Sequence, residues 1–166
     1  ASSFVFIDLL ELARWQYGLL LFSMAFTYLL GTVLCRRLLL RFGVQQTVAI
    51  GGAFTLLGGG LMAVNLALGW LSTLSLMGPF YLFVLAHGIH QPCGQSGAVG
   101  PFPKAAGAAS ALGGFLMMVI AFSTGLWLGT AKDGSAIPMV QSIAFWAVLT
   151  ALSAWLLVLR RGGPRV

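Results

Sequence analysis

The sequence predicts an all-α integral membrane protein, because it is strongly apolar, nearly devoid of charge and divided into long apolar runs. Of its 166 residues, 59% are hydrophobic and only 7% are charged, whereas a soluble domain carries about 25% charge. Such a chain has too few ionisable groups to cover a water-facing surface, and its mean hydropathy of +0.97 agrees. Disorder is excluded as well, because disordered chains are poor in apolar residues and rich in charge.

Five apolar runs are each long enough to cross a bilayer, whose core of about 30 Å takes about 20 helical residues. The segments between the runs contain glycine, proline and charged residues, which are typical of loops. The opening stretch, residues 2–10, is apolar but too short to span, so we expect it to be the end of a helix that begins earlier. The runs cover residues 15–34, 48–68, 71–85 with a more polar continuation, 105–128 and 137–159.

The basic residues predict the orientation, because Lys and Arg accumulate in short cytoplasmic loops. If successive spans alternate in direction, seven of the nine basic residues fall on one side: Arg36, Arg37, Arg41, Lys104, Arg160, Arg161 and Arg165. The other side receives Arg14 and Lys132 together with the three acids, Asp8, Glu11 and Asp133. This distribution predicts a cytoplasmic C-terminus. It also predicts that the net charge of +6 serves membrane topology, so no nucleic-acid partner is expected.

Small residues within the spans predict a packed bundle, since helices in lipid associate where small side chains let their backbones approach. Examples are Gly51-Gly52, Gly58-Gly59-Gly60, and the series Ala106, Ser110 and Gly114 at four-residue spacing. The two cysteines, Cys35 and Cys93, are too few and too far apart in the sequence to indicate a disulfide framework or a zinc site. Both are expected near the cytoplasmic face, where thiols stay reduced.

Two stretches of the chain carry a family resemblance. Residues 35–43 read CRRLLLRFG, and the second stretch runs from GIHQP at 88–92 through AVGPFP at 98–103 to AGAASAL at 106–112. Together, in this order and spacing, they resemble the Bcr/CflA branch of the drug:proton antiporters in the major facilitator superfamily. Cys93 departs from this pattern, because the branch often has asparagine after the proline.

The resemblance implies that residues 1–166 form the C-terminal transmembrane bundle of a transporter, with five full transmembrane helices after the end of a preceding one. It implies two six-helix halves that rock about a central cavity. The implied activity is multidrug efflux by drug:proton antiport in a bacterial inner membrane, with a proton gradient as energy source and no cofactor. The implied partners are hydrophobic drugs, protons, the lipid bilayer and the N-terminal half of the same transporter.

Polar residues inside the spans are the candidates for a substrate cavity, since each must face a partner or water. His87, Gln91 and Gln95 recur every four residues and share one helix face, with His90 nearby. Ser23 and Thr27 repeat that spacing in the first span, although such hydroxyls often bond only to their own helix. His87 and His90 form too small a set to predict a metal site, and no metal is expected.

Two connecting segments have both structural and functional interpretations. Arg36, Arg37 and Arg41 anchor the chain on the cytoplasmic side or, as the resemblance implies, form a cytoplasmic gate loop that holds one access state closed. Gly100, Pro101 and Pro103 form a helix-linking loop, which either transmits motion between two helices or only ends the first of them.

An enzyme is not expected, because the sequence contains no catalytic triad pattern, no pair of buried carboxylates and no phosphate-binding loop. Besides a transporter, the sequence permits a membrane-embedded structural or assembly subunit without transport activity.

Overall fold

The computed structural model describes residues 4–70, 72–131 and 134–161, which fold into helices joined by short turns. In chain order the elements are η1 (Phe4–Leu9), α1 (Arg14–Ala67), α2 (Thr73–Val99), η2 (Pro103–Ala105), α3 (Ala106–Thr130), α4 (Ile137–Leu152), η3 (Ser153–Val158) and α5 (Leu159–Arg161). Four helical segments, Arg14–Ala67, Thr73–Val99, Pro103–Thr130 and Ile137–Val158, are long and apolar enough to cross a membrane. The all-helical prediction is therefore confirmed for the described residues, and the helices indicate a multi-pass membrane protein.

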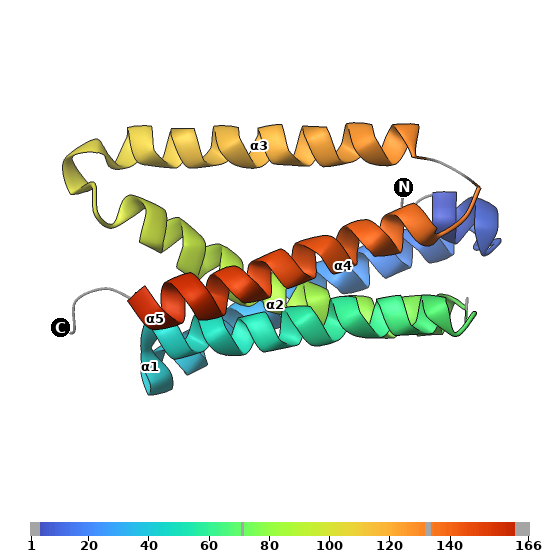
Figure 1. Ribbon diagram of the computed structural model, residues 1–166, viewed down its shortest axis with the longest axis horizontal. Coiled ribbons are helices and arrows are strands. Elements are labelled where there is room, and N and C mark those ends of the chain that lie inside the picture. Colours follow the sequence, from blue (N-terminus) through green and yellow to red (C-terminus); the bar gives the residue numbers. More distant parts are fainter. Residues whose placement is uncertain (1–3, 71, 132–133, 162–166) are drawn as a thin grey trace.

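α1 is folded back on itself at Gly43. A straight helix of its 54 residues would be about 80 Å long, far more than the bilayer core. At Gly43, however, φ is 74° and ψ is 176°, a non-helical conformation that glycine adopts without a steric penalty. Figure 1 shows the chain reversing at this point, so that the first arm (residues 14–42) and the second arm (residues 44–67) run in opposite directions.

The helix of the first arm extends further than the sequence predicted. The expected span ended at residue 34, and Arg36, Arg37 and Arg41 were expected in a loop. These arginines instead lie in the last turns of the first arm, which remains helical up to Gly43. The reason is local: leucine and arginine favour helix, and no breaker occurs between residue 34 and Gly43.

Basic segments gather at one end of the molecule. Figure 1 shows the turn at Gly43, the turn that contains η2, and α5 at the same end, whereas η1, the C-terminal end of α3 and the start of α4 lie at the other. The first group of segments carries Arg36, Arg37, Arg41, Lys104, Arg160 and Arg161. Asp8 and Glu11 lie at the opposite end, in or just after η1. Lys132, Asp133 and Arg165 fall outside the described residues.

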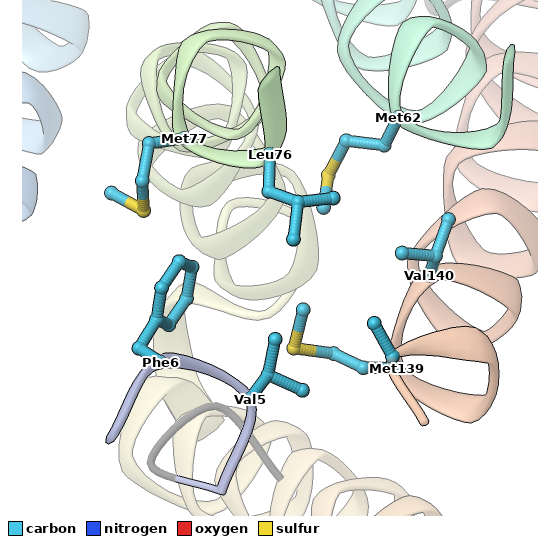
Figure 2. Close-up of a cluster of buried hydrophobic side chains, with 8 residues drawn as sticks. Val5, Phe6, Met62, Leu76, Met77, Met139 and Val140 are labelled. Carbon is cyan, nitrogen blue, oxygen red and sulfur yellow. The ribbon is translucent and has the colours of Figure 1, made fainter. Parts of the chain in front are cut away.

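Two buried clusters hold the helices together, one toward each end. The first joins η1, α1, α2 and α4, and Figure 2 shows its side chains converging from these four elements: Val5, Phe6, Met62, Leu76, Met77, Ala136, Met139 and Val140. The second joins both arms of α1 to α2 and η3 through Cys35, Val48, Ile89, Cys93 and Ala154. The indole nitrogen of Trp155 reinforces the second cluster by donating to the carbonyl of Ala49 at 3.1 Å.

Glycines allow the helices within the bundle to touch through their backbones. Gly31 of α1 faces Gly88 of α2, where a Cβ on Gly88 would lie 2.5 Å from the Tyr28 carbonyl oxygen and 2.9 Å from the Gly31 Cα. A Cβ on Gly58 would lie 2.7 Å from the backbone nitrogen of Phe83. Gly51 lies at a contact with α2, Gly52 at a contact with η3 and the end of α4, and Gly59 at a contact with α4, as the sequence predicted. The prediction was wrong for Gly60, where an added Cβ would meet nothing within 4 Å.

The small-residue series Ala106, Ser110 and Gly114 behaves differently from the prediction. None of the residues of α3 is buried, and a Cβ on Gly114 would meet nothing within 4 Å. α3 is joined to its neighbours mainly through its ends, and Figure 1 shows it set apart from α2 and α4. The spacing of small residues is present, but among the described residues it does not bring α3 into close backbone contact with another helix.

Candidate functional site: the groove along α3

A pocket between α2 and α3 collects the polar residues that the sequence singled out. Its volume is about 320 Å³, and it is lined by His87, His90, Gln91, Gly94, Gln95, Ala98, Val99, Ala109, Ser110, Gly113 and Met117. The predicted face of His87, Gln91 and Gln95 therefore lies along one cavity. The helix continues without a break through this polar stretch to Val99, which is why the four-residue spacing is preserved in space.

The two histidines of this α2–α3 pocket have different surroundings. His87 lies beside Tyr28 of α1 with ring centroids 5.8 Å apart, and Gln91 follows it by one helical turn on α2. His90 is packed against Gly51, where an added Cβ would lie 3.0 Å from the ring. The Nε2 atom of His90 is buried and has no hydrogen-bond partner among the described residues.

A second pocket lies between α3 and α4, and sequence reasoning missed it. It is the larger of the two, at about 490 Å³, and is lined by Ser123, Thr124, Trp127, Gln141, Ser142, Phe145 and Trp146. Gln141 carries the only side-chain amide in the final apolar run, and Phe145 follows it by one helical turn. That isolated amide was the available signal, but nothing in the sequence pairs α4 with Trp127 of α3.

A third cavity lies along α3 and shares lining residues with both pockets. Its volume is about 440 Å³, and its lining is Met117, Ile120, Ala121, Thr124, Gly125, Leu128 and Trp146. It shares Met117 with the α2–α3 pocket, and Thr124 and Trp146 with the α3–α4 pocket. We call the three together the α3 groove. Its walls are mainly apolar and aromatic with a few amide, hydroxyl and imidazole groups, a composition that suits bulky apolar ligands.

Ser23 and Thr27 do not line the α3 groove. The Ser23 hydroxyl lies against its own helix at the Leu20 carbonyl and against the Tyr81 hydroxyl of α2. The Thr27 hydroxyl donates to the Ser23 carbonyl at 2.9 Å. Both side chains therefore make the intrahelical bonds that were the alternative interpretation, and Ser23 also connects α1 to α2.

The predicted gate residues and linking residues occupy the basic end of the molecule. Arg36, Arg37 and Arg41 are exposed, and the Arg41 guanidinium lies 5.2 Å from the centre of the Phe42 ring. Gly100 ends α2 in a helical conformation, with φ −52° and ψ −43°, so it makes no positive-φ turn. Pro103 begins η2, where its missing amide proton costs no helical hydrogen bond.

The structure also brings together two cysteines that the sequence separates. Cys35 of α1 and Cys93 of α2 are both buried, and their sulfur atoms are 3.6 Å apart. The sequence offered no reason to pair them, because the contact depends on how α1 crosses α2.

No family model, curated protein or solved structure matches this chain. The observations that bear on its function are therefore the apolar helices, the basic end and the α3 groove.

Proposed function

We propose that this chain is the C-terminal bundle of a major facilitator superfamily transporter that exports hydrophobic drugs by drug:proton antiport. The α3 groove is the observation that carries the proposal. It runs along a helix that could cross a membrane, and it combines an apolar surface with few polar groups. A bulky apolar compound would be held by Trp127, Trp146 and Met117, and oriented by the amides of Gln91 and Gln141.

The N-terminal half of the same transporter forms the opposite wall of the cavity. α3 supports this assignment, since it presents large apolar side chains on an unburied helix, among them Phe115, Met118 and Phe122. Proton coupling is then assigned to carboxylates of that half, because Asp8 and Glu11 lie at the end opposite the basic segments. Substrate binding alternates between the two faces as the halves rock.

The proposal places the basic end in the cytoplasm of a bacterial inner-membrane protein. Arg36, Arg37 and Arg41 act there as gate residues, by pairing with acids or helix carbonyls of the N-terminal half in one access state. Their exposure on the last turns of the first arm supports this role.

Cysteine labelling at the two ends of one helical segment tests this orientation. Lys104 and Thr130 are both exposed and lie near opposite ends of Pro103–Thr130. In a C35S/C93S background, we expect a membrane-impermeant maleimide to label T130C in intact cells and to label K104C only after lysis. If K104C is labelled from outside and T130C is protected, the orientation is the reverse of the one proposed. That result would contradict the proposed export from the cytoplasm.

Dye binding tests the groove itself. Trp127 and Trp146 line the groove, whereas Trp15 and Trp70 are exposed elsewhere. We expect the lipophilic dye Hoechst 33342 to quench the tryptophan fluorescence of the detergent-solubilised chain saturably. The W127F/W146F variant should lose most of this quenching, and the matched W15F/W70F variant should keep it. Equal loss in both variants would exclude the groove as the binding site, and no saturable quenching at all would favour the structural-subunit alternative.

A further inference from the structure

The thiols of Cys35 and Cys93 form a buried pair at the crossing of α1 and α2. Their sulfur atoms are 3.6 Å apart, and the Cys35 thiol also donates to the carbonyl of Ile89 at 3.5 Å. The exposed fractions of the two residues are 1% and 6%. The chain contains no other cysteine. Any disulfide within these 166 residues must therefore join these two positions.

The backbone contact next to the pair keeps the two sulfur atoms close. Gly31 lies one helical turn before Cys35 in α1, and Gly88 lies in the corresponding region of α2, five residues before Cys93. A Cβ on Gly88 would lie 2.9 Å from the Gly31 Cα, so the two helices touch without intervening side chains. Helices in such contact have little freedom to separate. The two sulfur atoms therefore stay close together and need to move only a short distance to form a bond.

The surroundings of the pair decide which reagents reach it. Val48, Ile89 and Ala154 close around the two cysteines, with Leu38 and Leu39 packed against this cluster. Because a charged group is costly to bring into such an apolar cover, a reagent that reaches the two thiols must be small and uncharged.

We propose that Cys35 and Cys93 form a thiol-oxidation site, at which small, uncharged two-electron oxidants of the halogen and hypohalous acid class create a disulfide that joins α1 to α2. With iodine the first thiol displaces iodide, giving a sulfenyl iodide and releasing one proton. The second thiol attacks that sulfur, the S–S bond forms, the S–I bond breaks, and a second iodide and proton leave. The two sulfurs together lose two electrons, and one iodine molecule gains them. A thiol reductant restores both cysteines.

Thiol counting in the full chain tests the site. Membranes are treated with molecular iodine or with tetrathionate, a charged oxidant, and then denatured and labelled with polyethylene-glycol maleimide, which adds one gel-shift step for each free thiol. We expect two steps in untreated and tetrathionate-treated protein, none after iodine, and two again after iodine followed by dithiothreitol. The oxidised protein should run as a monomer without reductant.

A displaced cysteine provides the matched control. Gly94 follows Cys93 directly and is exposed, and a Cβ there would meet nothing within 4 Å. The C93S/G94C variant keeps two thiols but turns one away from Cys35, so we expect peptide mass spectrometry after iodine to find no disulfide-linked pair in it, whereas the wild-type chain gives the Cys35–Cys93 pair. The proposal is wrong if wild-type protein keeps its steps after iodine, if it forms only disulfide-linked dimers, or if the displaced variant forms an intramolecular disulfide equally well.

Discussion

Replacing Gly88 by valine should prevent the bundle from forming in most molecules. Gly88 crosses Gly31 with no side chain between the helices, and its added Cβ would lie 2.5 Å from the Tyr28 carbonyl oxygen. The obstruction is backbone, so no side-chain rotation can relieve it, and α1 and α2 would have to move apart. Overpacking of a close-packed core costs about 1–3 kcal/mol or more. Separation of these helices should exceed about 3 kcal/mol, because both buried clusters depend on their contact.

Unfolding in detergent measures this effect. We expect G88V to lose the monodisperse elution peak of the wild-type chain and to unfold at a lower fraction of sodium dodecyl sulfate in a circular-dichroism titration. G94V is the matched control, because it adds the same side chain to the same helix in open space. G31V should resemble G88V, and the double variant should be little worse than either, since both remove one contact. Equal stability of G88V and G94V would show that the two helices do not cross at Gly88.

Substitutions at His87 and Gln91 should reduce drug efflux by the complete transporter about tenfold each, which corresponds to about 1.4 kcal/mol. Both side chains line the α2–α3 pocket, and they lie one helical turn apart on α2. H87A or Q91A removes one of the few polar groups that can hydrogen-bond to a ligand in a largely apolar cavity, and such a bond contributes about 0.5–1.5 kcal/mol. The H87A substitution also removes the contact between the His87 ring and the Tyr28 ring of α1.

Everted membrane vesicles with an imposed pH gradient provide the measurement, with Hoechst 33342 as the transported dye and matched expression of each variant. Q46A is the control, because Gln46 is an exposed amide on the second arm of α1 and lies outside the groove. We expect H87A and Q91A to insert normally and Q46A to transport normally. Wild-type efflux by both pocket variants would remove this pocket from the transport pathway.

Local properties of the chain were sufficient to predict its long apolar helices and the end at which most of the described basic residues gather. With 59% hydrophobic residues, backbone groups in lipid can be satisfied only within helices or closed barrels, and the runs have helical length. Because successive spans run in opposite directions, Arg41, Lys104 and Arg160 lie at one end of the molecule regardless of how the helices pack. The four-residue spacing of His87 and Gln91 likewise needed only a continuous helix to become one face of a cavity.

Contacts between distant parts of the chain had no such local signal. The pairing of Cys35 with Cys93 and the meeting of Trp127 with Gln141 both depend on which helices are neighbours and where they cross. The sequence around a glycine in an apolar run does not show whether that glycine lies at a backbone contact, as Gly88 does, or in open space, as Gly114 does. Helix neighbours are chosen by the fit of whole surfaces. Spacing within one helix therefore identified candidate faces, and three-dimensional packing selected the faces that meet.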